Sequence, residues 1–378
     1  MSPRRNTFLG LTLIALTATM AQAAPVHVGE VPYVEAPMPF TITAVATLDT
    51  PWAIAMMPDG RMLITEKPGR MFIVTPEGKK TSLDNVPKVE FVGQNGLLDV
   101  ALAPDFASSN EFYITYLQPG DQRGMLVLAK ARLVEDATGA RLEDFRKIWT
   151  QTPPNGGEQP GGVIAFDPDG QHLFLALGDR MTAESAQNPD EARGKILRLN
   201  LDGTTPEDNP QFASGGVRAQ TWTTGHRNPY GLAFDANGKL WSIEMGPFGG
   251  DEVNLIEPGK NYGWPEVSEG DNYDGTPIPR HATRPEFTPP LLYWSPIIAP
   301  TGMAFYQGDM FPEWKGSAFV GGLASELLVR LAFDDKGGVT EGNRWSIGGR
   351  VRDVAVAADG AIWAIEDTSE GRLWRLSR

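Results

Sequence analysis

One pattern constrains the fold of this 378-residue chain more than any other: a short turn between apolar, strand-forming segments that returns along the sequence. Asp-Gly and related pairs between such segments are typical of β-hairpins. The copies are Met57-Pro58-Asp59-Gly60, Ala103-Pro104-Asp105-Phe106, Phe166-Asp167-Pro168-Asp169-Gly170, Phe234-Asp235-Ala236-Asn237-Gly238 and Ala357-Ala358-Asp359-Gly360, with a sixth, looser copy between 302 and 321.

The spacing of these copies predicts an all-β fold, a six-bladed β-propeller of four-stranded antiparallel blades. Each interval is long enough for several strands, and sustained helical periodicity is absent after residue 23. A β-sandwich is the alternative, but sandwiches do not usually repeat one turn chemistry at such spacing. We expect one domain from 40 to 378, closed by pairing between its two ends, because the segments 361–365 and 373–376 resemble earlier strands.

The N-terminal segment has the layout of a secretory signal peptide over residues 1–23. Arg4 and Arg5 precede an apolar stretch from Phe8 to Met20, and the small residues Ala21 and Ala23 follow it. A membrane anchor is disfavoured because the stretch is shorter than the roughly 20 residues that span a bilayer. We therefore expect a periplasmic or secreted protein with no membrane anchor after cleavage, and an N-terminal extension over 24–39.

Composition limits the chemistry that the chain can perform. The formal net charge is −14, which disfavours nucleic acid as a partner and suits a neutral sugar or a bound cation. The sequence has no cysteine, so disulfides, thiolate catalysis and cysteine metal sites are excluded. It has only four histidines, which disfavours a centre built from several of them.

A loop-rich run between 225 and 265 predicts a binding site. Glycine lets the backbone approach a ligand closely and proline holds it in place, whereas core packing requires neither in such numbers. The run contains Gly225-His226-Arg227-Asn228-Pro229-Tyr230-Gly231, Met245-Gly246-Pro247-Phe248-Gly249-Gly250-Asp251-Glu252 and Asn261-Tyr262-Gly263-Trp264-Pro265. The following stretch, 266–290, is predicted to be a long surface loop that forms part of the substrate rim.

Together with further motifs, this run closely resembles the soluble periplasmic PQQ-dependent aldose sugar (glucose/sorbosone) dehydrogenases. The resemblance covers most of the mature chain and implies oxidation of an aldose hydroxyl with PQQ and calcium, and a soluble electron acceptor. The further motifs are Gly93-Gln94-Asn95-Gly96-Leu97-Leu98, Gly178-Asp179-Arg180, Gly194-Lys195-Ile196-Leu197-Arg198, Ala299-Pro300-Thr301-Gly302 and Arg350-Val351-Arg352-Asp353-Val354.

The resemblance also implies which residues hold the cofactors. Arginine suits the three carboxylates of PQQ because its planar fork offers paired, permanently charged donors. Calcium accepts oxygen ligands in irregular geometry, so backbone carbonyls suffice for it. Taken singly, each arginine is more consistent with an ordinary ion pair, but three arginines in matching motifs reverse that preference. The implied PQQ contacts are Arg227, Asn228, Arg350 and Arg352, and the implied calcium ligands are the carbonyls of Gly246 and Pro247. Asp251 and Glu252 are either further calcium ligands or turn-stabilising groups.

The sequence departs from the family at the catalytic base. Gln159 occupies the position of the family's general-base histidine, and Val163 replaces an arginine that follows it. An amide does not accept a proton usefully near neutral pH, so weak or absent activity is expected unless the adjacent Glu158 serves as base. Arg227 completes the expected catalytic group. Two further departures flank the calcium ligands, Met245 before them and Phe248 after them.

The resemblance implies substrate contacts for Gln94, Glu158 and Arg180, because they occupy positions that line the substrate cavity in relatives. Trp294 is predicted either to offer a stacking face to the sugar or to pack in the core. All of these groups are expected in one funnel at one end of the propeller.

Two other function classes remain open from the sequence. One is a propeller that binds a carbohydrate or a partner without catalysis. The other is a calcium-dependent lactonase or hydrolase, which would need several carboxylate and amide side chains on one metal.

Overall fold

The computed structural model describes residues 24–29, 38–120 and 124–378, so the predicted signal peptide lies outside the described residues. The described part is nearly all β, as predicted, and its helical pieces are short. No helix within it is both long and apolar enough to cross a membrane. The helical elements are α1 (Phe106–Ser109), α2 (Gly216–Gln220), η1 (Ala183–Ala186), η2 (Phe212–Ser214), η3 (His281–Thr283) and η4 (Pro312–Trp314).

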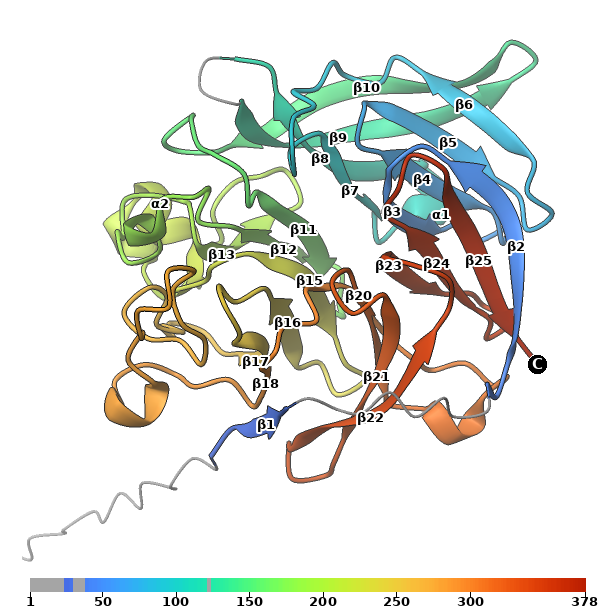
Figure 1. The fold of residues 1–378 in the computed structure, drawn as a ribbon. Helices are drawn as coiled ribbons and strands as arrows, with labels where there is room; N and C mark the ends of the chain where they lie inside the picture. Colours follow the sequence, from blue (N-terminus) through green and yellow to red (C-terminus); the bar gives the residue numbers. More distant parts are fainter. Residues whose placement is uncertain (1–23, 30–37, 121–123) are drawn as a thin grey trace, which may run out of the picture.

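The strands form consecutive antiparallel meanders arranged around a common centre in a β-propeller-like fold (Figure 1). The first two meanders join through the parallel pair β6–β10 into one eight-stranded sheet. Their strands are β3 (Pro51–Met56), β4 (Met62–Glu66), β5 (Arg70–Val74) and β6 (Lys80–Asp84), then β7 (Leu97–Leu102), β8 (Glu111–Gln118), β9 (Met125–Asp136) and β10 (Gly139–Thr150).

The next three meanders each form a separate sheet. The third holds β11 (Gly161–Phe166), β12 (His172–Leu177), β13 (Lys195–Asn200) and β14 (Thr221–Thr224). The fourth holds β15 (Pro229–Phe234), β16 (Leu240–Glu244), β17 (Asp251–Ile256) and β18 (Leu292–Trp294). The fifth holds β19 (Pro300–Phe305), β20 (Ala318–Gly322), β21 (Leu327–Phe333) and β22 (Val339–Ser346).

The last sheet closes the ring by combining both ends of the chain. It contains β23 (Val351–Val356), β24 (Ile362–Glu366) and β25 (Gly371–Ser377), with β2 (Thr41–Leu48) antiparallel to β25 at its outer edge. Figure 1 shows blue β2 beside red β25. The first strands β3, β7, β11, β15, β19 and β23 contact one another in a closed cycle. The expected pairing between the two ends is therefore confirmed.

The predicted N-terminal extension contributes an additional strand. Within it, β1 (Val26–Val28) pairs in parallel with β18, so that the fourth sheet has five strands. Residues 30–37, between β1 and the ring, lie outside the described part of the chain.

The recurring turn joins the first and second strands of a meander. Gly60 has φ 85° and its N–H donates to Met57 O at 3.0 Å, and Gly360 repeats this with φ 83° and a bond to Ala357 O at 2.9 Å. Only glycine adopts this conformation at little cost, which explains why the pattern is visible in the sequence. The copy at Asp105 differs, because α1 replaces the tight turn there.

Each first strand contains a register shift near its beginning, between Pro51 and Ala53, for example, and between Val351 and Asp353. A β-bulge leaves one residue outside the regular pairing and redirects its side chain. The same shift occurs in β7, β11, β15 and β19. Tyr230 and Arg352 lie at two of these bulges, at the end of the fold where the expected site residues gather.

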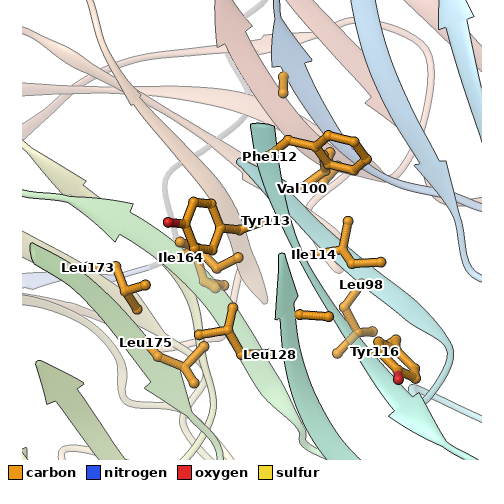
Figure 2. Packing of buried hydrophobic residues seen from close by; sticks show 14 of the residues in the cluster. Leu98, Val100, Phe112, Tyr113, Ile114, Tyr116, Leu128, Ile164, Leu173 and Leu175 are labelled. Atoms are coloured by element: carbon orange, nitrogen blue, oxygen red, sulfur yellow. The ribbon is translucent and has the colours of Figure 1, made fainter. Parts of the chain in front are cut away.

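Apolar side chains fill the space between neighbouring sheets. Figure 2 shows Tyr113 and Leu128 of the second meander beside Ile164, Leu173 and Leu175 of the third. These residues are buried, and the cluster continues through the first and fourth meanders. A core of this kind holds each sheet through its neighbours, so that loops at the ends of the sheets are supported from two sides.

Candidate functional site

The topology gathers most of the predicted site residues at one end of the fold, which we call the site end. In each meander, this end carries the connection between the second and third strands and the entry into the next first strand. Gln94 precedes β7, Glu158 and Gln159 precede β11, Arg227 and Asn228 precede β15, Gly246 and Pro247 lie between β16 and β17, Arg350 precedes β23, and Arg352 is the second residue of β23.

Arg227 is the most extensively bonded of these residues. Its Nη1 donates to the carbonyls of Met245 at 3.0 Å and Gly246 at 2.8 Å, and its Nη2 donates to Tyr273 Oη at 3.1 Å. The guanidinium also lies over the rings of Trp264 and Tyr273. Only 6% of the residue is exposed, and Nε has no hydrogen-bond partner among residues 24–29, 38–120 and 124–378. A permanent positive charge is thus held at the expected cofactor site.

His226, next to Arg227, has a structural role. Its side chain is fully buried, with Nδ1 2.9 Å from Glu244 Oε1 and Nε2 2.9 Å from Thr223 Oγ1. The other Glu244 oxygen accepts the Arg227 backbone N–H at 2.7 Å. Both histidine nitrogens are engaged, so this histidine is not available as the missing base.

Gln159 lies between Arg227 and Asp179. With its amide nitrogen facing Asp179 Oδ1 at 2.6 Å, its oxygen accepts from Arg227 Nη2 at 2.9 Å. Asp179 Oδ2 accepts from Trp264 Nε1 at 2.8 Å, and burial raises the pKa of this carboxyl against the opposing effect of Arg227. Gln159 also has φ 58°, a conformation that non-glycine residues adopt at a cost and that is enriched at functional sites.

Tyr230 connects this group to the opposite side of the site. Its hydroxyl donates to Gln94 Oε1 at 2.8 Å, and its ring lies 5.6 Å from the Arg352 guanidinium carbon. Burial raises its pKa to about 12, with Arg352, Asn228 and Arg180 opposing the shift. Gln94, Asn228 and Arg352 therefore surround one phenol, although they come from three different meanders.

Arg350 and Arg352 meet at Asp367, in the turn after β24. Asp367 Oδ2 accepts from Arg352 Nη2 at 2.7 Å and from Arg350 Nη2 at 3.1 Å, while Lys67 Nζ lies 3.7 Å from Oδ1. Burial alone would raise the pKa of Asp367, but Arg352 and Lys67 hold it at about 2. Three cations thus share one ionised carboxylate, which leaves the group with a net positive charge.

In the loop with the expected calcium ligands, the backbone at Gly246 packs closely against the backbone at Gly249. A Cβ on Gly246 would come within 2.3 Å of Gly249 O, so a larger residue does not fit. Asp251 Oδ1 accepts the Gly246 N–H at 2.8 Å, and Asp251 Oδ2 accepts the N–H groups of Ile298 and Ala299 at 2.7 Å each. Asp251 is therefore a turn-stabilising group, the second of the two roles expected for it.

Glu252 is buried behind this loop. Its Oε2 accepts from Asn254 Nδ2 at 3.2 Å, and burial raises its pKa to about 8 against the opposing charge of His281. The sequence left its role open between calcium ligation and turn stabilisation.

The structure corrects the stacking role expected of Trp294. This residue has no exposed surface, belongs to the same buried apolar cluster as Trp241 and Val253, and donates from Nε1 to Glu341 Oε2 at 2.6 Å. Its ring therefore has no face open to a ligand. The alternative interpretation, core packing, is the correct one.

Of two other residues expected in the substrate wall, Arg180 differs from the expectation and Glu158 does not. Arg180 is only 1% exposed and donates to Asn95 Oδ1 at 2.9 Å and to Gly124 O at 3.2 Å, and burial lowers its pKa to about 10. It therefore fixes the loops around the site and does not line an open cavity. Glu158 is partly exposed and lies against Gly93, where a Cβ would come 2.3 Å from its Oε1.

The three departures from the family other than Gln159 occupy different environments. The Asn228 amide donates to Met245 Sδ at 3.8 Å, so Met245 contacts a predicted cofactor residue. Phe248 is 67% exposed at the rim. Val163 is buried and borders an axial cavity of about 150 Å³, together with Asp99, Tyr230, Arg352 and Asp353.

Sequence reasoning missed Lys67, Asp367, Tyr273 and the role of Tyr230. Asp179 and Trp264 lay within the motifs named above. Asp179 could have been identified by asking which motif residue serves as the hydrogen-bond partner of residue 159. Lys67 and Asp367 carry no local signal, because each is simply the first residue after a strand that ends in glutamate. Their contact depends on the closure that brings β23 and β24 beside β3.

Comparison with known proteins agrees with this geometry. The sequence model of the family described as "Glucose / Sorbosone dehydrogenase" matches residues 48–375. The chain is 40% identical to "Aldose sugar dehydrogenase YliI" of Escherichia coli over 342 residues, covering 87% of this chain and 90% of that protein. It is 29% identical to "Quinoprotein glucose dehydrogenase B" of Acinetobacter calcoaceticus, with 86% and 84% covered.

A solved structure extends the likeness to three dimensions. The PQQ-bound form of aldose sugar dehydrogenase from Streptomyces coelicolor superposes with a TM-score of 0.73 at 28% identity, covering 90% of this chain and 99% of that one. The family match spans most of the chain, and the matched region contains the site residues from Lys67 to Asp367. The chain therefore belongs to the glucose/sorbosone dehydrogenase family.

Proposed function

We propose that this protein is a PQQ- and calcium-dependent oxidoreductase that oxidises a hydroxyl group of an aldose or related sugar. Its six meanders are then the blades of a six-bladed propeller. One observation carries the proposal: the buried arginines Arg227 and Arg352, from different sheets, each keep an Nε–H at the site end that has no hydrogen-bond partner within the described part of the chain. Buried donors without partners are rare, and a ligand with several carboxylates satisfies both.

The residues present fit PQQ. Arg227, Arg350 and Arg352 supply fixed positive charge for its carboxylates, and Asn228 Oδ1 is a further buried polar atom to which no described residue donates a hydrogen bond. When bound, PQQ supplies the ortho-quinone that accepts electrons from the sugar, and calcium supplies Lewis acidity. Relatives named as a quinoprotein and as a PQQ-bound dehydrogenase support this choice of cofactor.

The loop at Gly246 and Pro247 fits calcium, because its carbonyls are oxygen donors and calcium tolerates irregular geometry. Gly246 O already accepts a hydrogen bond from the cationic Arg227. The oxygen therefore faces positive charge in this structure, as it would with a metal ion.

The sugar contacts that we propose are Gln94 and Glu158, with Tyr230 holding the Gln94 amide. Since Trp294 is buried, the exposed rings of Phe248 and Tyr273, 67% and 71% exposed, are the available stacking faces at this rim. Aromatic rings suit the apolar face of a sugar.

Gln159 determines the expected rate. Its amide is held between Asp179 and Arg227 and does not accept a proton near neutral pH. We therefore propose that activity is weak in the native sequence, with Glu158 as the remaining candidate base.

We also propose that the protein is exported and that a soluble acceptor takes the electrons.

A non-catalytic sugar- or partner-binding propeller is the second candidate, and Gln159 is the observation that favours it. The lactonase alternative is less well supported. In the axial cavity, both oxygens of Asp99 accept backbone N–H groups, from Val100 and Ile164, and both oxygens of Asp353 accept those of Ile54 and Val354. These carboxylates are engaged in binding neighbouring sheets together.

Reconstitution tests the proposal. Purified protein is incubated with PQQ and calcium, freed of unbound cofactor, and examined for quinone absorbance and for aldose-dependent dye reduction. Retained quinone with slow, sugar-dependent reduction is the expected result. Retained quinone without any reduction would favour the binding protein, and no retained quinone would contradict the cofactor assignment.

A further inference from the structure

Lys67 is held at the site end by two neighbouring meanders. It lies in the turn between β4 and β5, where its N–H donates to Thr50 O at 3.0 Å and its carbonyl accepts from Leu97 N at 3.0 Å. A Cβ on Gly96 would come 2.4 Å from Lys67 O, so the two loops are in close contact. The residue is 9% exposed. Its ammonium position is thus fixed beside the loop that carries Gln94.

The charges around Lys67 do not balance. The charged groups that face it are Asp367, from the turn after β24, and Arg350 and Arg352, at the start of β23. The preceding carboxylate, Glu66, is bound to Arg70 and to the Asp49 N–H. One carboxylate therefore serves three cations, an excess of positive charge within a chain whose net charge is −14.

Lysine differs from the two arginines in one chemical respect. Burial lowers the pKa of Lys67, Arg352 and Arg350 lower it further, and Asp367 opposes them. Arginine stays protonated at any pH at which proteins are folded, whereas a buried lysine can release its proton. An arriving carboxylate stabilises the ammonium form, so the amine takes up a proton from solvent when the pH is high enough for it to be neutral beforehand.

We propose that Lys67 is the third cation of a polycarboxylate-binding group with Arg350 and Arg352, and that ligand binding protonates it at alkaline pH. The inference rests on the proposed function, since PQQ is the tricarboxylate in question. It adds a binding residue from a different blade and a proton that is coupled to binding.

Calorimetric titration of PQQ, with calcium present, tests the inference without any assay of activity. Titrations at pH 6.5 and 8.5, each in two buffers of different ionisation enthalpy, give both the affinity and the number of protons taken up. The variants are Lys67→Met, Lys67→Arg and, as a matched control, Lys130→Met. Lys130 is a lysine on β9 with a similarly buried side chain (12% exposed, against 11% for Lys67), and it pairs with Glu111 away from the site. Thermal unfolding checks that each variant is folded.

The wild type is expected to take up more protons at pH 8.5 than at pH 6.5, because a larger fraction of Lys67 is neutral before binding at the higher pH. Lys67→Met should bind at least tenfold more weakly at pH 6.5 and take up none, because a charge-assisted contact is lost. Lys67→Arg should retain affinity and lose the proton uptake, and Lys130→Met should behave as the wild type. Wild-type affinity and uptake in Lys67→Met would overturn the inference.

Failure of the proposed function is distinguishable from failure of this inference. If the wild type does not bind PQQ, the cofactor assignment is wrong, and the same titration with citrate decides the role of Lys67. Citrate binding that weakens in Lys67→Met and not in Lys130→Met supports the polycarboxylate-binding group. Citrate binding that is absent, or equal in both variants, contradicts it.

Discussion

Asp179 accepts a 2.6 Å hydrogen bond from the side-chain amide of Gln159, in the orientation that also lets the amide oxygen accept from Arg227. A buried carboxylate beside this position would orient an imidazole and stabilise its protonated form. Asp179 is therefore placed to orient a catalytic base at residue 159, although the residue there is a glutamine. Gln159 also has φ 58°, in a region of backbone conformation that histidine adopts more readily than most residues.

Gln159→His is expected to raise aldose-dependent dye reduction by about two orders of magnitude or more, the typical contribution of a general base. Val163→Arg, which restores a second polar group of the family, should add to this effect. PQQ affinity should change little, because Arg227, Arg350 and Arg352 make the carboxylate contacts. Steady-state kinetics and cofactor titration of the same preparation measure the two effects separately.

The wild-type rate provides the control for this prediction. If the unmodified protein already turns over at about 10 per second or more, a rate typical of enzymes, a histidine is dispensable at residue 159. Glu158 then becomes the leading base, and Glu158→Gln should abolish the activity. If no variant binds PQQ, the ligand-binding propeller is the better description.

Arg352→Ala should weaken PQQ binding by about 10- to 100-fold in both the wild-type and the Gln159→His backgrounds, since a hydrogen bond to a charged group contributes about 1.5–3 kcal/mol. Arg375→Ala is a suitable control, because Arg375 pairs with Asp359 in a recurring turn at the other end of the last sheet. Equal affinities for the two variants would remove Arg352 from the cofactor site.

Much of the fold was predictable because its repeat unit contains a tight turn with a left-handed backbone position, which glycine adopts at little cost. Gly60 and Gly360 occupy the same left-handed conformation, and the sequence around each is visible without a structure. The copy at Asp105 was predicted as a similar turn, yet it begins α1, because a tight turn and a single helical turn share the same small polar residues. The pairing of β1 with β18 had no local signal, since three residues at a sheet edge carry too little pattern.

The site was predictable only where a motif carried it. Arg227 and Arg352 were identified through resemblance, and the topology brings both to the site end. Lys67 and Asp367 were not, because closure of the ring creates their contact. The role of Trp294 stayed open between sugar stacking and core packing, because a tryptophan near a loop looks the same in sequence whether its ring faces solvent or, as here, lies in a buried apolar cluster.

Substitutions at Trp294 should affect stability and not sugar binding. Trp294→Ala is expected to cost about 3–5 kcal/mol of unfolding free energy, the usual cost of truncating a large buried aromatic residue. Trp294→Phe, which loses mainly the bond to Glu341, should cost less and leave sugar affinity unchanged. Urea unfolding and sugar titration measure the two quantities. A large loss of sugar affinity in the Phe variant, with little loss of stability, would restore its role as a stacking face.

The carboxylates of the axial cavity should make the protein less stable as the pH rises. Burial raises the pKa of Asp99 to about 8 and that of Asp353 to about 7, from an ordinary value near 3.8. The folded pKa values lie above the unfolded ones, so the stabilising contribution is complete below about pH 4 and is lost as the pH rises toward 7 and 8. Over this window the native state holds a proton that the unfolded chain has released, and each group lowers the unfolding free energy by about 1.4 kcal/mol per pH unit.

Asp353→Asn removes one of these titrations. The variant is expected to be less stable than the wild type at pH 5, because each Asp353 oxygen accepts one backbone N–H, from Ile54 or Val354, and the amide replaces one of these oxygens with an NH2 donor. Its unfolding free energy should nevertheless fall less steeply between pH 5 and 6.5, by about 1.4 kcal/mol per pH unit. Urea titrations at several pH values measure the slope, and Asp59→Asn, in an exposed turn, should leave it unchanged. An unchanged slope in Asp353→Asn would show that this carboxyl group is already ionised in the folded protein at pH 5.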